Sequence, residues 1–237
     1  MYQKKLNLNK TTTPIILAYS GGLESSFILF SLIQQNVNFI AVTIDNGLIP
    51  SYHKKFIQKT IETMKINHTF LSFDYKKIKP LRENSKQRCY YCKKEMFTLL
   101  KIFADTKGGV VIDGTAHYDL NKDRPGLLAK QELNILSPLT KQYFSRQSMI
   151  NILSENNFPF MINNTCLITR FPVENKLNKE RLSIIENCES LLWENGAREF
   201  RIRVKNKNHF QLEIKNYNIN IEKTVEECRE KIFIKPI

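Results

Sequence analysis

The sequence contains little glycine and no long hydrophobic segment. Eight of its 237 residues are glycine, about 3% against a usual ~7%, so the position of each glycine is informative. The longest unbroken apolar run, from Ile15 to Tyr19, is far shorter than the ~20 residues that a membrane-spanning helix needs. The residues from Met1 to Lys5 lack the apolar core of a secretory signal. We therefore expect a cytoplasmic protein that has no membrane partner.

Cysteine is too sparse and too unevenly placed for a disulfide framework. The chain has five cysteines, and an odd count in a chain without a secretory signal favours metal-binding or catalytic thiols. Cys89 and Cys92 have CxxC spacing, but no second CxxC completes a closed four-ligand zinc site. Cys188 and Cys228 lie in helical patterns, and we assign both to core packing.

Acidic residues are fewer than basic ones. The formal net charge is +13, from 36 Lys and Arg against 23 Asp and Glu. Residues 76–107 hold ten basic and three acidic residues, more than half of this excess. Such a charge favours a polyanionic partner. The 42% apolar and 11% aromatic content argue against disorder, and the length fits one domain or one domain with a small appendage.

Apolar runs alternate with helical patterns through most of the chain. Unbroken apolar strands alternating with helices are typical of an α/β fold, a parallel sheet with helices on both faces. In such folds ligands bind beyond the carboxyl ends of the strands, here the loops that follow residues 20, 46, 74 and 115. The predicted strands are 14–20, 39–45, 68–73 and 110–113, and the predicted helices are 24–35, 51–66, 95–103 and 145–156.

The pattern changes near residue 175. A helix is predicted over 178–195, a hairpin over 200–204 and 210–214, and a last helix over 221–231. We therefore predict two domains, an α/β domain over 1–172 and a small α+β domain over 173–237.

A glycine pair stands between the first strand and the first helix. Gly21 and Gly22 allow a sharp turn and the close approach of a ligand to the backbone. The helix that follows offers free N–H groups and the positive end of its dipole to an anion, and the hydroxyls of Ser20, Ser25 and Ser26 add donors. These residues predict a loop that holds a phosphate group. The pattern contains neither Gly-Lys-Ser/Thr nor G-x-G-x-x-G, which excludes the Walker loop and the dinucleotide-binding loop. The alternative interpretation is an ordinary tight turn between a strand and a helix.

The string from Ser20 to Ser26 resembles the SGGxDS loop of the PP-loop ATPases. This superfamily includes GMP synthetase, NAD synthetase, asparagine synthetase and tRNA-thiolating enzymes, and its members adenylate a substrate oxygen while the loop holds pyrophosphate. The resemblance implies a PP-loop fold that binds ATP and Mg²⁺. Glu24 takes the place of the pattern's Asp, so a carboxylate is kept one methylene farther from the backbone.

The remaining cysteines lie in polar surroundings. Cys89 and Cys92 stand in the most basic stretch, where Lys and Arg favour the thiolate, and their spacing suits metal, iron–sulfur or redox chemistry. The alternative is a pair of cysteines at the start of a helix. Cys166 has polar neighbours and Arg170 four residues on, which suits a reactive thiol better than a small buried apolar residue.

Several strings in the same order resemble the LarE family of ATP-dependent sacrificial sulfur transferases, which mature the nickel-pincer nucleotide cofactor of lactate racemase. They are SGGLESS (20–26), RCYYCKKEMF (88–97), DGTAHYDL (113–120), RPG (124–126), ILSPL (135–139), CLITRFP (166–172) and RIRV (201–204). The resemblance spans residues 14 to about 204 and identifies the chain as a divergent member.

The resemblance implies roles for particular residues. The family adenylates a carboxylate of a pyridinium mononucleotide, and a cysteine at the position of Cys166 attacks the adenylate and gives up its sulfur, leaving dehydroalanine. Arg170 and Asp119 are the other implied catalytic residues. ATP contacts are implied for Ser20, Gly21, Gly22, Glu24, Ser25, Ser26, Asp45, Asp113, Gly114 and Thr115, and contacts to a phosphorylated small-molecule substrate for Arg88, Arg124, Arg201 and Arg203. In other members three cysteines hold a [4Fe-4S] cluster, a trio that Cys89, Cys92 and Cys166 match.

Two departures keep other interpretations open. Where the family string reads roughly DGTNxDD, Ala116 replaces the amide and Tyr118 replaces one carboxylate. The charge also suits a tRNA-thiolating enzyme, with tRNA as the partner, and the departures motivate a degenerate nucleotide-binding protein without enzyme activity. Family members form larger assemblies, so we expect a homo-oligomer.

Overall fold

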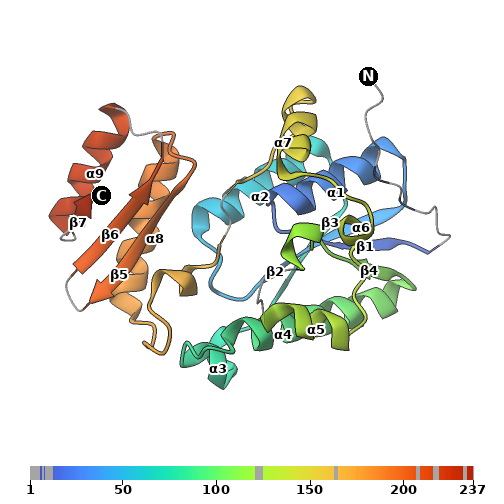
Figure 1. Ribbon diagram of the computed structural model, residues 1–237, viewed down its shortest axis with the longest axis horizontal. Coiled ribbons are helices and arrows are strands. Elements are labelled where there is room, and N and C mark those ends of the chain that lie inside the picture. The colour runs from blue at the N-terminus through green and yellow to red at the C-terminus, as the bar shows by residue number, and fades with distance from the viewer. Residues whose placement is uncertain are drawn as a thin grey trace. The chain divides into compact units, whose positions relative to one another are not determined.

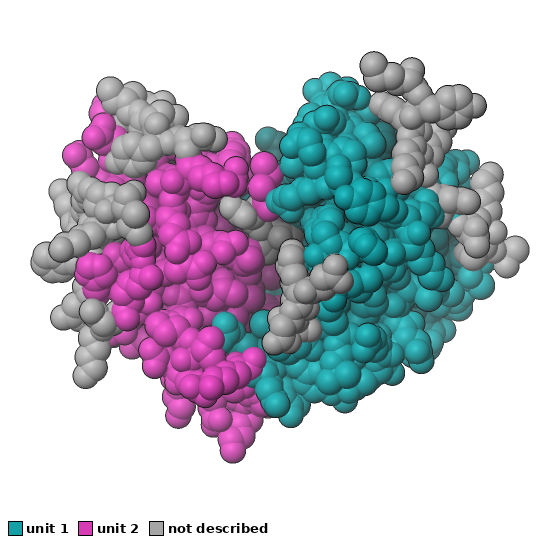
Figure 2. Space-filling model, viewed as in Figure 1, with its two compact units in different colours: residues 1–45, 57–73, 87–161 teal, residues 46–56, 74–86, 162–237 magenta. Residues whose placement is uncertain are grey.

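The computed structural model describes residues 6, 8, 13–120, 125–162, 165–206, 209–215, 219–231 and 234–236. The chain forms two compact units, coloured separately in Figure 2. Unit 1 holds residues 1–45, 57–73 and 87–161, and unit 2 holds residues 46–56, 74–86 and 162–237. The division into domains at residue 172 stays a prediction.

Unit 1 is built on a parallel sheet, which confirms the predicted α/β class. Each strand is a short apolar run, and the sheet order is β3-β2-β1-β4 with all neighbours parallel. An isolated parallel bridge joins Ile112 to Leu136 beyond β4. The strands are β1 (Ile15–Ala18), β2 (Phe39–Asp45), β3 (His68–Ser72) and β4 (Val110–Ile112).

Helices cover both faces of this sheet. α4 and α5 lie on one face, and α1 and α7 lie together on the other (Figure 1). The helices are α1 (Leu23–Gln34), α2 (Ser51–Met64, of which residues 57–64 belong to unit 1), α4 (Arg88–Lys107), α5 (Pro125–Glu132), α6 (Pro138–Lys141) and α7 (Arg146–Glu155).

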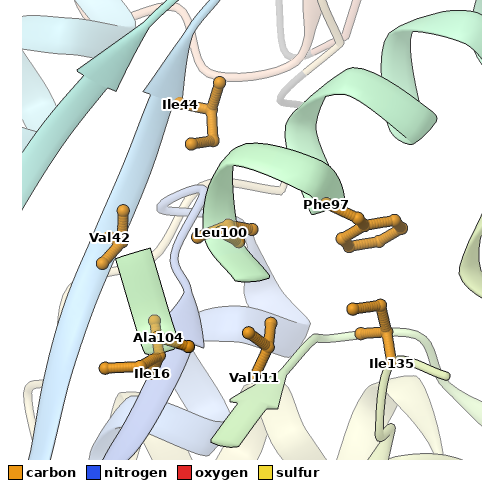
Figure 3. Packing of buried hydrophobic residues seen from close by; sticks show 8 residues of the cluster. All are labelled: Ile16, Val42, Ile44, Phe97, Leu100, Ala104, Val111 and Ile135. Carbon is orange, nitrogen blue, oxygen red and sulfur yellow. The ribbon is translucent and has the colours of Figure 1, made fainter. Parts of the chain in front are cut away.

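The core of unit 1 fills the space between the sheet and α4. Phe97, Leu100 and Ala104 form one stripe along α4, as their spacing of three and four residues requires. They pack on Ile16 and Val111 of the sheet (Figure 3). Each large side chain buried here contributes about 1.5–3 kcal/mol, so the stripe holds α4 firmly against the strands.

Unit 2 contains the predicted hairpin. β5 and β6 pair antiparallel, β7 pairs parallel with β6, and Ile202, Val204, Phe210 and Leu212 are buried on one face. Tyr52, near the start of α2, stacks on Trp193 at 5.4 Å between ring centroids. The elements are α3 (Lys79–Arg82), α8 (Lys179–Glu194), β5 (Phe200–Asn206), β6 (His209–Ile214), α9 (Ile219–Lys231) and β7 (Ile234–Pro236).

The structure differs from the predicted elements mainly around α4. The helix predicted from residue 95 begins at Arg88, so Cys89 and Cys92 lie in its first five residues, as the alternative interpretation of this pair has it. The helix α5 was not predicted. Residues 88–94 show no apolar stripe because the buried face of α4 starts at Phe97. Gly108, at φ 59°, ends α4 in the left-handed conformation that glycine favours. Among the described residues, no helix has the length and apolarity to cross a membrane.

Candidate functional site: the phosphate loop and the cysteine segments

The loop Ser20–Gly22 connects β1 to α1 in unit 1. Gly21 has φ +69°, a conformation that side-chain-bearing residues rarely adopt, and Gly22 is the N-cap of α1. Two backbone hydrogen bonds to Met161 anchor the turn: Met161 N–H donates to Gly21 O at 2.9 Å, and Leu23 N–H donates to Met161 O at 3.1 Å. The glycine pair therefore makes the sharp turn that its position predicts.

Hydroxyl groups order the inside of this loop. The Ser25 side chain is buried, and its Oγ accepts from the Ser20 N–H at 3.2 Å and donates to Gly22 O at 3.2 Å. Ser20 Oγ lies 3.1 Å from Ser25 Oγ. Ser26 is fully buried beneath the loop. These contacts fix the loop before any ligand binds, which lowers the entropic cost of binding.

Backbone N–H donors and a close-packed glycine meet at the start of α1. Helix geometry leaves the N–H groups of Glu24 and Ser25 without an intrahelical acceptor. A Cβ on Gly114 would lie 3.0 Å from Ser25 N and 3.3 Å from Glu24 Cβ, so only glycine lets this backbone approach α1 so closely. The N–H donors at this helix start suit an anionic group such as a phosphate.

The Asp113 carboxylate forms hydrogen bonds that hold the loop after β4. The carboxylate is 3% exposed and accepts from Thr115 N–H at 3.2 Å, from Thr115 Oγ1 at 2.5 Å and from Ser137 Oγ. With its oxygens engaged by these donors, Asp113 positions Gly114 against α1. Asp113 and Thr115, which were predicted to contact the nucleotide, therefore lie beside the start of α1, and their hydrogen bonds hold Gly114 in place.

The Glu24 carboxylate lies between two side chains from distant segments. Tyr118 Oη donates to Glu24 Oε1 at 2.5 Å, and Arg146 Nη1 donates to the same oxygen at 3.2 Å. Burial, followed by the bond to Glu24, raises the pKa of the Tyr118 phenol, so it stays protonated at neutral pH. The longer carboxylate at position 24 and the tyrosine at position 118, two departures from the family pattern, are therefore in contact.

A small cavity of about 90 Å³ lies beside Asp113 and Asp119. Asp119 is 8% exposed and accepts from Ala116 N–H at 3.3 Å. The volume suits a few water molecules rather than a nucleotide. Its lining residues are Lys93, Phe97, Asp113, Thr115, Asp119, Gly126, Leu127 and Lys130. Asp45 lies at the end of β2, where its carbonyl accepts from Phe73 N–H at 3.1 Å.

The CxxC cysteines, three residues apart, lie on one side of the first two turns of α4 in unit 1. Cys89 is exposed and Cys92 is half-buried, with Sγ 3.9 Å from Met96 Sδ. Beside them, Nε and Nη1 of Arg88 are buried and have no hydrogen-bond partner within the part of the chain that the structure describes. Cys166 belongs to unit 2. No group of three or more His, Cys, Asp or Glu in the described ranges is arranged to hold a metal ion, and the cluster stays a prediction.

Cys166 is the N-cap of a short 3-10 helix, Leu167–Arg170, in unit 2. The half-buried Cys166 presents its carbonyl to Thr169, whose N–H and Oγ1 donate to it at 3.1 and 2.8 Å. Arg170, at the end of the same turn, is 2% exposed and forms a two-point ion pair with the fully buried Glu189, at 2.6 and 2.9 Å. Burial acts to lower the pKa of Arg170, but the Glu189 charge outweighs it and the pKa is raised. Arg170 therefore holds the cysteine segment in place.

Two further arginines, Arg201 and Arg203, lie half-buried on one face of β5. Arg203 Nε pairs with Glu213 at 2.6 Å, and its Nη1 donates to Thr169 O at 3.0 Å. The pKa of Arg201 is lowered by burial and then by the charges of Arg170 and Arg203. Ile202 between them is fully buried on the other face, as the alternation of side chains along a strand requires. Arg124 lies outside the described residues.

Sequence reasoning missed the partners that complete these arrangements. Arg146 and Glu189 were assigned no role, although each neutralises a predicted site residue. A signal existed for Glu189, since a carboxylate four residues after Ile185 and beside Cys188 falls on the apolar face of α8. A buried charge usually has a partner. Arg146 showed no comparable signal.

The chain is similar to three curated proteins, and no family model matches it. It is 35% identical over 179 residues to the uncharacterized protein MJ0830 of Methanocaldococcus jannaschii, covering 75% of this chain and 69% of that one. It is 28% identical over 195 residues to the uncharacterized protein slr1717 of a Synechocystis species, covering 79% and 72%. It is 24% identical over 197 residues to the pyridinium-3,5-bisthiocarboxylic acid mononucleotide synthase of Lactiplantibacillus plantarum, covering 81% and 71%.

Proposed function

This chain belongs to the same family as MJ0830 of Methanocaldococcus jannaschii, and we propose that it is an ATP-dependent sulfur transferase of the LarE type. The observation that carries the proposal is the similarity, over 81% of this chain, to a synthase whose name describes a bisthiocarboxylic acid mononucleotide. In this proposal a carboxylate of a small phosphorylated substrate is adenylated, and sulfur replaces one of its oxygens.

The phosphate loop supports the nucleotide half of the proposal. It is ordered by Ser20 and Ser25, it has backbone N–H groups at the start of α1 without an intrahelical acceptor, and Gly114 packs closely beside them. These groups suit the polyphosphate of ATP, with Mg²⁺ as the expected counter-ion. Adenylation gives the carboxylate a good leaving group, AMP, and releases pyrophosphate.

The cysteine segment supports the sulfur half. We assign the nucleophile to Cys166, whose thiolate attacks the activated carbonyl carbon and expels AMP, forming a thioester. Removal of the Cys166 Cα proton then breaks the Cβ–S bond, so the sulfur leaves with the product as a thiocarboxylate and the protein keeps dehydroalanine. Arg170 fixes the turn that carries Cys166, and Arg201 is the cation that we assign to the substrate phosphate.

Pyrophosphate release from ATP and the mass of the intact protein test this proposal. We expect release in the wild type and in Cys166→Ala, since adenylation precedes the attack of sulfur. After turnover only the wild type should lose about 34 Da, the mass of H₂S, at Cys166. Absence of ATP binding in calorimetry would overturn the enzyme proposal. Turnover without the mass loss would exclude a sacrificial cysteine and leave a cluster held by Cys89, Cys92 and Cys166, which absorbs near roughly 400 nm under anaerobic conditions.

A tRNA substrate is the second candidate, favoured by the net charge of +13. Phosphate contacts make such binding strongly salt-dependent. A gel shift with tRNA that weakens steeply with salt would favour this candidate, and no shift at low salt would exclude it.

A further inference from the structure

The Glu24 carboxylate poses an electrostatic problem for the proposed phosphate loop. Glu24 is the second residue of α1, and its own N–H is one of the free donors at the start of that helix. A carboxylate this close to the donors repels an incoming phosphate through space, and the repulsion is strong because the side chain is only 22% exposed. Left uncompensated, the charge of Glu24 would offset the attraction that the positive end of the helix dipole has for an incoming anion.

The structure compensates this charge from two directions. Arg146, the first residue of α7, brings a full positive charge to Glu24 Oε1, and Tyr118 donates a neutral hydrogen bond to the same oxygen. Arg146 lies 122 residues from Glu24 in the chain. Ser145 caps α7 by accepting from Ser148 N–H at 3.1 Å, which fixes the position from which Arg146 extends.

We propose that Arg146 is a positioning residue that neutralises Glu24, so that the phosphate loop accepts a polyphosphate without a metal ion on that carboxylate. The inference rests on the proposed function, because it concerns the same loop. It assigns Arg146 an indirect role: the guanidinium acts on Glu24, and the anion contacts the backbone. Tyr118 holds the carboxylate toward Arg146 and shares its charge.

Binding of inorganic pyrophosphate in the presence of EDTA, measured by calorimetry, tests this role. We expect Arg146→Gln to weaken binding about fivefold to tenfold, the effect of exposing one partly buried charge. Arg146→Lys keeps the charge and should bind within about twofold of the wild type. Glu24→Gln should bind at least as well as the wild type. The double variant Glu24→Gln/Arg146→Gln should match Glu24→Gln within about twofold, because no charge then needs compensation.

Lys94→Gln is the matched control. It removes one positive charge from unit 1 at an exposed ion pair with Glu132 on α4 and α5, and we expect pyrophosphate binding to remain at the wild-type level. Arg146→Gln binding at the wild-type level would overturn the inference. So would a double variant as weak as Arg146→Gln, since Arg146 would then contact the anion directly. A wild-type protein that binds neither pyrophosphate nor ATP would overturn the proposed function together with the inference.

Discussion

The phosphate loop of unit 1 and the cysteine segment of unit 2 use charge in opposite ways. At the loop, backbone N–H groups are free and the neighbouring ion pair, Glu24 with Arg146, is partly exposed, at 22% and 45% of the two side chains. At the cysteine segment the two charges neutralise each other, since Arg170 and Glu189 are at most 2% exposed and form an ion pair. The loop therefore keeps backbone donors for the anion that we propose, whereas the Arg170 pair holds a backbone turn.

The largest expected effect comes from breaking the buried pair. Arg170→Met leaves Glu189 as an uncompensated buried charge, and we expect unit 2 to lose about 3–5 kcal/mol of unfolding free energy. Urea denaturation followed by the fluorescence of Trp193, the single tryptophan of the chain, reports on this unit. Trp193 stacks on Tyr52 in the folded state.

Glu189→Gln is the informative companion of Arg170→Met. The amide keeps an acceptor for the Ile202 N–H, which donates to Glu189 Oε1 at 2.9 Å, but it removes the charge. We expect a loss of similar size, because Arg170 is then the unpaired buried charge. A cost below about 1 kcal/mol for either variant would contradict a buried, self-satisfied pair.

The second prediction concerns the close approach of Gly114 to the start of α1. In Gly114→Ala the new methyl group meets Ser25 N at 3.0 Å, and we expect pyrophosphate binding to fall at least tenfold, with about 1–3 kcal/mol lost in stability. Gly108→Ala is the control, because Gly108 has a strained φ of +59° that destabilises an alanine, but no atom lies within 4 Å of its Cβ position. It should cost about 1–2 kcal/mol and leave binding unchanged. Equal loss of pyrophosphate binding in both variants would show that lower stability, and not the contact of the new methyl group with α1, causes the loss.

The two regions also differ in how much of their structure could be predicted from the sequence. The loop was predictable because Gly21 and Gly22 and an apolar strand are local signals, and the strands β2 and β3 follow from apolar runs. The contacts Arg146–Glu24 and Arg170–Glu189 join residues 122 and 19 positions apart. The apolar face of α8 marks Glu189 as a buried charge, but which arginine pairs with a carboxylate depends on how the helices pack, which no local pattern records. The start of α4 was predicted only as the alternative placement of Cys89 and Cys92, because it carries no apolar stripe.

A smaller effect is expected from pH, through the support beneath the loop. His68 Nε2 lies 2.8 Å from Thr43 Oγ1, which donates to the carbonyl of Tyr19, the residue before the loop. Burial lowers the pKa of His68 from 6.5 to about 4. Between these values the unfolded chain binds a proton that the folded chain does not, so stability falls as the pH drops from 6.5 toward 4.

Half-exposure of His68 limits the size of this effect to about 1 kcal/mol between pH 7 and pH 5. Urea midpoints from circular dichroism at the two pH values measure it. In His68→Gln, which keeps an N–H donor for Thr43, this part of the pH dependence should disappear. An unchanged pH profile in the variant would assign the dependence to other groups.

The smallest expected effect separates the contribution of burial to an ion pair from that of the distance between its charges. Arg203–Glu213 and Arg170–Glu189 have the same Nε–Oε1 distance of 2.6 Å, but the Arg203 pair is 30% and 41% exposed. Water solvates either partner of the Arg203 pair once the other is removed, so Arg203→Gln should cost no more than about 1 kcal/mol by Trp193 fluorescence. Glu213→Gln should cost the same, since neither partner is left dry. If Arg203→Gln instead costs as much as Arg170→Met, the distance between the two charges, and not their burial, would determine how much each ion pair stabilises unit 2.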